Sequence, residues 1–227
     1  MEEETRCLRE PVYASKINSI NRVYQKYGVL IINRAAILDN VKRIHELTNK
    51  RIIAVVKENG YGVGLYNSYL ILRQAGIDFF AVSVPAEAFA LRQYGWAGDI
   101  LLMSPVMETD KCVPLIEENI SMAVCSKGQL EIIKESAYIC GKNPRLHLKF
   151  DCGFGRYGFG SDDVEFLKEN LNCSNIEGCY MDFGGISIFQ FIKEAVLEDS
   201  FKNLEILLMQ CGLMEITLCF TEQIPER

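Results

Sequence analysis

Two short stretches carry the residues whose types and spacing could do chemistry, and the first is centred on Lys57. An apolar run at 52–56 ends at this lysine, and a glycine-rich turn at 58–64 follows it. Because side chains alternate along a strand, we expect Ile53, Val55 and Lys57 to share one face. A partly desolvated amine at the C-terminal end of a strand favours imine formation with a carbonyl compound, and the glycines let backbone approach a ligand closely. The alternative is a strand-end lysine that reaches into solvent.

The second stretch is a strand predicted at 145–151, in which apolar and polar residues alternate. One face is apolar and suited to covering helices, whereas the other carries His147, Lys149 and Asp151. Charged groups that point inward on a central strand are costly unless they are paired, so this face predicts a site or a salt-bridged interior. The alternative is an edge strand with one solvent-facing side.

The residues at 153–158 match the G-x-G-x-x-G dinucleotide motif letter for letter. A dinucleotide-binding fold has this motif after its first strand, with an acidic residue about 20 positions later at the end of the next strand. Here the motif follows a much later strand, and Glu177 lies near the start of the next one. We therefore reject dinucleotide binding.

The elements that must position these residues alternate between strands and helices. After a β-branched run at 29–32, seven segments are predicted to be strands: 52–56, 78–84, 100–103, 120–125, 145–151, 176–182 and 215–220. Helical patterns between them imply parallel strands joined by crossovers, which is an α/β fold. With about seven of eight strands, we expect an incomplete TIM-type (β/α) barrel or an open sheet over residues 29–227, after a partly helical leader at 1–28.

The composition of the 227-residue chain excludes several functional classes. A hydrophobic fraction of 49% can bury a substantial core, which excludes a disordered or collagen-like chain. The net charge of −6 argues against nucleic-acid binding, and no apolar run approaches the ~20 residues of a membrane span. The N-terminus is acidic, unlike a signal peptide, and the nine cysteines include no C-x-x-C pair. We expect a cytoplasmic protein with reduced thiols and no metal site.

Several separated motifs make the chain resemble the alanine racemase family. Residues 54–64 (A-V-V-K-E-N-G-Y-G-V-G) are similar to the signature A-V-V-K-A-N-A-Y-G-x-G, whose lysine binds pyridoxal phosphate (PLP). Residues 149–158 (K-F-D-C-G-F-G-R-Y-G) resemble the segment K-x-D-T-G-M-x-R-x-G. Between them, 80–83 and 87–92 look like the family's F-A-V-A and E-A-x-x-L-R. The resemblance covers roughly residues 28–183 and implies a TIM-type barrel of PLP fold type III.

The resemblance also implies a role for each matching residue. Lys57 would join the aldehyde of PLP as an imine and act as one proton-transfer base. Tyr61 would hold the cofactor phosphate. Arg156 would hydrogen-bond the phenolic oxygen of the cofactor, and Lys149 would be the family's carbamylated lysine, which orients that arginine.

The state of Lys149 affects its neighbour Arg156. As a carbamate, Lys149 is an anion and attracts the guanidinium. As an amine it carries a like charge, and the repulsion must be relieved by another group. Asp151 and His147 are the candidates for that group.

The C-terminal part of the chain departs from the family pattern. The motif G-x-Y-S-H-F reads G-C-Y-M-D-F at 178–183, so Asp182 replaces the histidine that stacks on the cofactor. The phosphate segment H-x-x-N-S corresponds to 217–221, where only Thr221 could offer a hydroxyl to the phosphate. We expect Asp182 and Thr221 to belong to the cofactor site.

In the family, the second proton-transfer base is a tyrosine of a C-terminal β-domain that reaches the barrel of the other subunit in a homodimer. We expect that domain to be absent, which would leave the run at 29–32 as an unpaired apolar edge. The leading hypothesis is a PLP-dependent amino-acid racemase that converts L-alanine to D-alanine for D-alanine biosynthesis. The alternatives are a non-catalytic PLP-binding single-barrel protein and an inert truncated fragment.

Overall fold

The computed structural model describes residues 30–151, 154–170 and 175–182. The chain consists of two compact units, Met1–Asn33 and Arg34–Arg227, and every element below belongs to the second. Residues 30–32 of the β-branched run at 29–32 do not form a strand. The side chains of Leu30 and Ile31 are exposed. The leader at 1–28 and the strand predicted at 215–220 lie outside the described residues.

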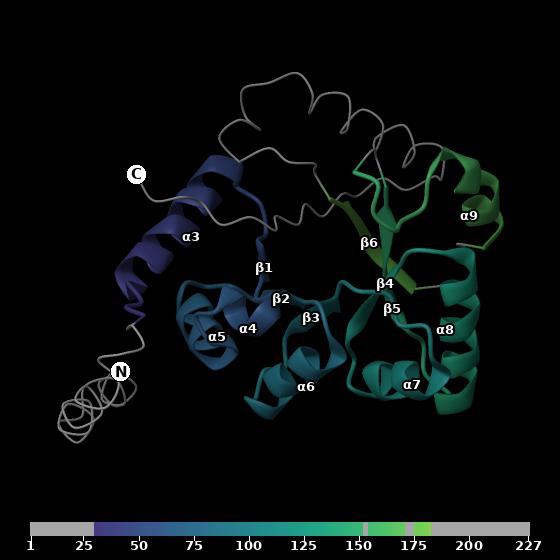
Figure 1. Cartoon of the computed structure of the whole chain (residues 1–227), viewed down its shortest axis with the longest axis horizontal. Helices are drawn as coiled ribbons and strands as arrows, with labels where there is room; N and C mark the ends of the chain where they lie inside the picture. The colour runs from purple at the N-terminus through teal and green to yellow at the C-terminus, as the bar shows by residue number, and fades with distance from the viewer. Residues whose placement is uncertain (1–29, 152–153, 171–174, 183–227) are drawn as a thin grey trace. The chain divides into compact units, whose positions relative to one another are not determined.

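Six parallel strands form one sheet and follow one another in chain order. They are β1 (Ile53–Val55), β2 (Phe79–Val82), β3 (Asp99–Leu102), β4 (Ser121–Val124), β5 (Arg145–Phe150) and β6 (Asn175–Met181). Each strand pairs in parallel with the next one along the chain. The sheet curls as part of a TIM-type barrel (Figure 1). The α/β prediction is therefore confirmed, with six of the seven predicted strands in place.

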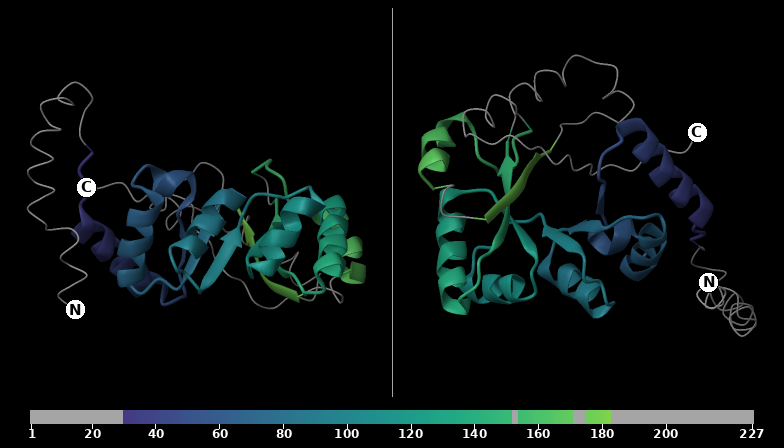
Figure 2. Two further views of the ribbon diagram at one scale, coloured as in Figure 1. Left: turned by 90° about the horizontal axis from the view of Figure 1, so that it is seen from below. Right: turned by 180° about the vertical axis from the view of Figure 1, so that it is seen from behind.

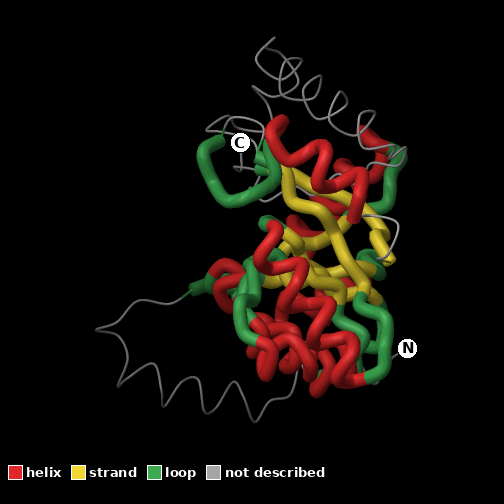
Figure 3. Tube along the Cα trace, turned by 90° about the vertical axis from the view of Figure 1, so that its right-hand side faces the viewer, coloured by secondary structure: helices red, strands yellow, loops and turns green. Residues whose placement is uncertain are grey.

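Helices occupy every connection between these strands, as parallel pairing requires. They are α4 (Lys57–Tyr61), α5 (Leu65–Gln74), α6 (Pro85–Gln93), α7 (Thr109–Glu117), α8 (Lys127–Cys140), the 3₁₀ turn η1 (Ser161–Asp163) and α9 (Val164–Asn170). One further helix, α3 (Arg34–Thr48), precedes β1. Helices α5 to α8 lie along the outer face of the curled sheet (Figure 2). Figure 3 shows the strands running beside one another with helices outside them.

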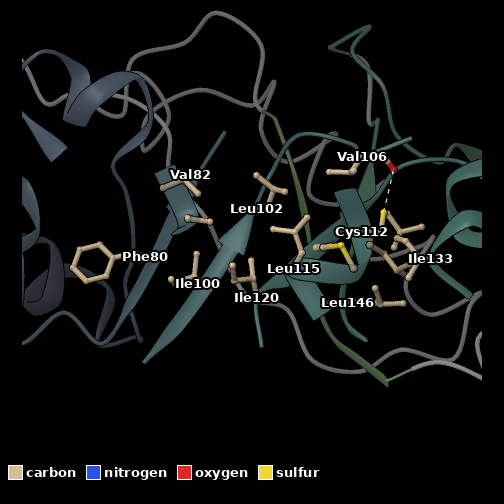
Figure 4. Close-up of a cluster of buried hydrophobic side chains, with 14 of the residues drawn as sticks. Phe80, Val82, Ile100, Leu102, Val106, Cys112, Leu115, Ile120, Ile133 and Leu146 are labelled. Carbon is tan, nitrogen blue, oxygen red and sulfur yellow. Dashed lines mark hydrogen bonds between the residues drawn. The ribbon is translucent and has the colours of Figure 1, made fainter. Parts of the chain in front are cut away.

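Side-chain alternation sorts the strand residues into two clusters. Toward the helices, Phe80, Ile100, Leu102, Leu115 and Ile133 belong to a large buried core (Figure 4). Toward the inside of the curl lies a smaller set, the inner cluster, made of Ile53, Phe79, Ala81, Leu101, Met103, Ala123, Cys125 and Tyr180. Because both faces are buried, the strands are apolar on both sides, as is typical of parallel sheets.

Ion pairs join the strands at their N-terminal ends, and we call this set the N-terminal network. Arg51 donates to Asp78 over 3.0 Å and to Asp99 over 2.7 Å. Asp99 also accepts from Arg145 over 2.7 Å, and Arg145 in turn donates to Glu177 over 2.6 Å. Each charge of this network therefore has a partner of opposite sign.

Two further observations concern the described helices and cysteines. No helix in the described ranges is long and apolar enough to cross a membrane. The four described cysteines, Cys112, Cys125, Cys140 and Cys179, are all free thiols.

Candidate functional site

The C-terminal ends of the strands bring the predicted chemical residues to one edge of the sheet. Lys57 follows β1 and Asp151 follows β5, while Asp182 follows β6. Because all six strands are parallel, these ends meet at the same edge (Figure 1). In α/β barrels this is the edge where loops assemble active sites.

Lys57 opens a turn with an unusual backbone. The next four residues, Glu58, Asn59, Gly60 and Tyr61, have φ of 54°, 55°, 63° and 52°, which is the left-handed region. Glycine and asparagine tolerate this region, but a left-handed conformation costs roughly 1–2 kcal/mol for an ordinary residue such as Glu58 or Tyr61. At Gly60 a Cβ would meet the hydroxyl of Ser68, so no larger side chain fits without movement. Strain of this kind concentrates at functional sites.

Neighbouring segments hold this strained turn in place. The Asn59 N–H donates to Glu87 Oε1 over 3.0 Å, and the other oxygen of Glu87 accepts from the Ser83 N–H over 3.2 Å. The Asn59 side chain accepts from the Leu65 N–H over 2.8 Å, and the Ser83 hydroxyl donates to Glu58 over 3.4 Å. Glu87 thus ties the turn after β1 to the start of α6.

The Lys57 side chain is half-buried and has no partner within the described ranges. Its amine makes no hydrogen bond or ion pair there, whereas the surrounding turn is held by several. Tyr61, at the end of the same turn, is also half-buried. The arrangement presents an amine without a described partner on a fixed backbone.

A second group of charges, here called the lysine–aspartate–arginine cluster, lies at the same edge. Its members are Lys149, Asp182 and Arg156. Asp182 Oδ2 lies 3.5 Å from Lys149 Nζ and accepts a 3.4 Å hydrogen bond from Arg156 Nη1. Only 1% of the Lys149 side chain and 9% of the Asp182 side chain are exposed, against 46% of Arg156. One carboxylate therefore neutralises a buried cation and anchors a half-exposed one.

The loop after β5 carries Arg156 and is tied back to that strand. Asp151 N–H donates to Phe159 O over 3.0 Å, and Phe159 N–H donates to Lys149 O over 2.8 Å. The Asp151 carboxylate accepts from the Gly155 N–H over 3.0 Å. Gly158 has φ of 152°, and a Cβ there would lie 2.6 Å from the Asp151 nitrogen, so only glycine allows this close return. Gly158 of the G-x-G-x-x-G pattern thus serves a tight loop.

Neutral side chains surround the lysine–aspartate–arginine cluster. Burial raises the pKa of the Cys125 thiol to about 12, although the positive charge of Lys149 opposes the shift. Burial also raises the pKa of the Tyr157 hydroxyl. The Tyr180 hydroxyl donates to Met103 O over 2.7 Å. At neutral pH the thiol and the Tyr157 phenol stay uncharged, which leaves Asp182 as the counter-ion.

His147 shares the inward face with Lys149 but lies toward the opposite end of the strand. Its ring packs edge-on against Phe79 at 5.9 Å, and its Nδ1 is buried with no hydrogen-bond partner among the described residues. Burial lowers its pKa to about 4, so the ring is neutral at pH 7. The prediction that His147 could relieve the repulsion between Lys149 and Arg156 is therefore wrong. Asp182 lies in that position instead.

The structure places most of the predicted site residues and adds one. Lys57, Tyr61, Arg156, Lys149 and Asp182 all lie after, or at the end of, their strands at one edge, whereas Thr221 is outside the described residues. Sequence reasoning does not single out Glu87, which is the first residue of the segment 87–92. Its signal was an acidic residue in the first turn of a helix that follows a buried strand.

Known proteins share this sequence and fold. Residues 32–186 match the family described as alanine racemase, N-terminal domain. The chain is 34% identical over 182 residues to an alanine racemase of Aquifex pyrophilus, which covers 78% of this chain and 49% of that protein. The crystal structure of alanine racemase from D-cycloserine producing Streptomyces lavendulae matches with a TM-score of 0.72 at 22% identity, over 82% of this chain and 50% of that one. A histidine racemase from Leuconostoc mesenteroides matches with a TM-score of 0.67 at 22% identity, over 76% and 46%.

The chain spans about half the length of these relatives. The matched residues include both chemical stretches, the Lys57 turn and the segment from Lys149 to Arg156. Since the family match also covers more than half of the chain, the chain belongs to the alanine racemase family.

Proposed function

We propose that this chain carries the PLP-binding barrel of an amino-acid racemase of the alanine racemase type. The observation that carries the proposal is Lys57, whose amine has no partner among the described residues and sits on a strained turn at the C-terminal edge of a parallel sheet. The family match supports the same reading of this lysine.

The residues of this edge fit PLP in charge and donor type. The aldehyde of the cofactor needs an amine that is free to react, and of the two lysines at this edge only Lys57 is without a partner in the described ranges. Lys149 is occupied by two carbonyl oxygens and a carboxylate. Arg156 uses one nitrogen on Asp182, and its remaining N–H donors suit an anionic oxygen. Tyr61 and Thr221 would contribute hydroxyl groups to the phosphate.

Each protein group has a defined task in the proposed reaction. When bound, PLP supplies an electron sink for the negative charge left on the amino acid when its Cα proton is removed. Lys57 Nζ takes or returns the proton on one face of Cα. Arg156 orients the ring through its donors, and the buried apolar inner cluster keeps water from the floor of the site. Inversion at Cα needs a second acid or base on the opposite face.

The proposed substrate is alanine, interconverted between its L and D forms. The Aquifex pyrophilus relative, named an alanine racemase, supports this choice. Because a histidine racemase has the same fold, the fold by itself does not select among amino acids. The proposed setting is the cytoplasm, where free thiols such as Cys112 and Cys125 stay reduced. As in the family, we propose a homodimer.

Absorbance and isotope exchange test the proposal in two steps. The chain is titrated with PLP, and Lys57→Ala is compared with the control Lys168→Ala, an exposed lysine of α9. We expect visible absorbance with the wild type and with the control but none with Lys57→Ala. The loaded protein is then incubated with L-alanine in D₂O, and exchange of the Cα proton and formation of D-alanine are both followed.

The outcomes separate the hypotheses. Exchange together with D-alanine supports a racemase, while exchange with retained configuration supports a single base at Lys57 and a missing partner on the other face. Colour without exchange indicates a PLP-binding protein that does not turn over alanine. No colour at all would refute the proposed function.

A further inference from the structure

We infer that Lys149 stays an unmodified ammonium and that Asp182 is the positioning residue that orients Arg156. The first half concerns this chain alone, whereas the second half rests on the proposed function because it assigns Arg156 to the cofactor site. The carboxylate needed beside the arginine then comes from β6 and not from a modification of β5.

The surroundings of Lys149 Nζ fit an ammonium group. Three acceptor atoms face it: Phe150 O at 2.8 Å, Tyr157 O at 3.2 Å and Asp182 Oδ2 at 3.5 Å. An ammonium has three N–H donors and no acceptor, so each proton has an oxygen to point toward. The match in number and type leaves no role for a further acceptor at this nitrogen.

Two aromatic rings add to this preference for a cation. Lys149 Nζ lies 5.7 Å from the centre of the Tyr157 ring and 5.8 Å from that of Tyr180. The faces of such rings carry negative potential and attract an ammonium group. They would repel an anionic group at the same place.

A carbamate would reverse these interactions. To form one, the Nζ lone pair attacks the carbon of CO₂, and the ammonium must give up two of its three protons to solvent. The product keeps a single N–H donor and adds a carboxylate, so two of the three acceptors around Nζ lose their partner. The new anion would also lie beside Asp182 in a place where only 1% of the Lys149 side chain is exposed. Two buried carboxylates side by side are strongly unfavourable.

Asp182 supplies what the carbamate would otherwise provide. The same oxygen, Oδ2, reaches Lys149 and Arg156, so one carboxylate both cancels the repulsion and fixes the guanidinium. Arg156 is additionally held against the Phe154 ring, 4.5 Å from its centre. Other titratable groups lie nearby. Burial raises the pKa of the Cys125 thiol and of the Tyr157 phenol, so both are neutral at pH 7, and the Tyr180 hydroxyl donates to Met103 O. Asp151 Oδ1 accepts from the Gly155 N–H, whereas Asp182 is the carboxylate with an ion pair to both cations.

Carbon-13 NMR tests the state of Lys149 on the full 227-residue chain. Wild type and Lys149→Arg are equilibrated with ¹³C-bicarbonate, and carbamate carbonyl signals are compared, since the variant keeps the charge but cannot form the carbamate. We expect identical spectra, in which any shared signals come from other amines. A carbamate signal in the wild type that Lys149→Arg lacks would overturn the inference.

A pH titration of the visible absorbance with PLP tests the positioning role. We expect Asp182→Asn to lower the pH midpoint of the absorbance change by about one unit. The variant leaves the positive charges of Lys149 and Arg156 without their carboxylate, and this extra positive charge disfavours protonation in the site. Asp182→Glu should restore most of the wild-type midpoint, and Asp39→Asn, which removes an exposed Asp–Arg pair on α3, should not move it. In a chain that also carries Arg156→Gln, Asp182→Asn should shift the midpoint by less than half of the shift it causes when Arg156 is present.

Equal shifts in both backgrounds would overturn the positioning role, because Asp182 would then act without Arg156. If the wild type binds no PLP, the proposed function fails and the positioning role fails with it. The NMR comparison still decides the state of Lys149 in that case, so the two failures are distinguishable.

Discussion

The two edges of the sheet use charge in opposite ways. At the N-terminal ends, Arg51, Asp99, Arg145 and Glu177 form an alternating network in which each member has at least one partner of opposite sign. At the C-terminal ends, Lys57 has no partner in the described ranges and follows directly on a buried strand. In such barrels the N-terminal face usually contributes to stability, and the C-terminal face carries the active site.

The lysine–aspartate–arginine cluster combines features of both edges. Lys149 is buried and neutralised like a structural ion pair, but its carboxylate partner also reaches Arg156, which is half-exposed at the edge where ligands bind. The comparison teaches that only those cations at the C-terminal edge that lack a full set of partners are available for chemistry. Removing charges from each end of the sheet in turn tests this difference.

The largest expected effect comes from Asp182→Ala. Because it leaves the buried ammonium of Lys149 without its counter-ion, we expect the free energy of unfolding to fall by about 4 kcal/mol. Urea denaturation measures this change, with Asp39→Ala, an exposed helical ion pair, as the matched control. If both variants lose the same stability, Lys149 and Asp182 are not a buried pair.

The next effect concerns His147 and acid. Burial keeps its pKa at about 4 in the folded chain, against 6.5 for the free side chain. As the pH falls from 6.5 to 4, the unfolded chain gains a proton that the folded chain does not, so stability falls in this window. His147→Leu should remove about 3 kcal/mol of that fall. His45→Gln, at an exposed position, should leave the slope as it is, and an unchanged slope in His147→Leu would contradict a buried neutral ring.

Asp99→Asn tests the N-terminal network. Burial would raise the pKa of this carboxyl, but hydrogen bonds from Arg51 and Arg145 outweigh it and lower the pKa below 3.8. A lowered carboxyl pKa stabilises the folded chain above pH 3.8, and the stabilisation is lost as the pH falls through the folded value. We expect Asp99→Asn to lower the free energy of unfolding by about 2 kcal/mol at neutral pH, and by less as the pH falls below 3.8. Chemical denaturation at several pH values measures this change. A loss that is the same at every pH would argue against the charge of Asp99 as its source.

The smallest expected effect is that of Glu87→Gln on cofactor binding. One of the two N–H donors, from Asn59 or Ser83, loses its acceptor, which loosens the turn that carries Lys57. We expect the Kd for PLP to weaken about fivefold, equivalent to about 1 kcal/mol. Glu131→Gln, on the exposed side of α8, is the control. Equal affinities in the two variants would mean that the turn holds its shape without Glu87.

The sequence predicted the faces of the strands better than the positions along them. Alternation correctly put His147 and Lys149 on the inward face of β5, because apolar and polar residues repeat with period two. It could not tell that His147 belongs to the N-terminal end, since two residues along a strand span roughly 7 Å and meet different neighbours. The sequence therefore offers His147 beside Asp151 as a candidate for relieving the repulsion between Lys149 and Arg156, where Asp182 lies.

Other features depend on contacts that no local pattern encodes. Asp182 meets Lys149 only because β5 and β6 pair in register, and the family pattern suggested a stacking position for it instead. The left-handed backbone from Glu58 to Tyr61 was also unforeseen, because glutamate and tyrosine rarely adopt it. The β-branched run at 29–32 favours a strand by propensity, yet residues 30–32 are not in a strand, since propensity alone does not form one.

The difference between Lys57 and Lys149 can be measured directly. The chain is incubated with PLP, reduced with borohydride and digested, and mass spectrometry then locates the modified lysine. The account predicts a label on Lys57 and none on Lys149, because only the first amine is free of acceptors in the described structure. A label on Lys149, or an unlabelled Lys57 in folded protein, would contradict it.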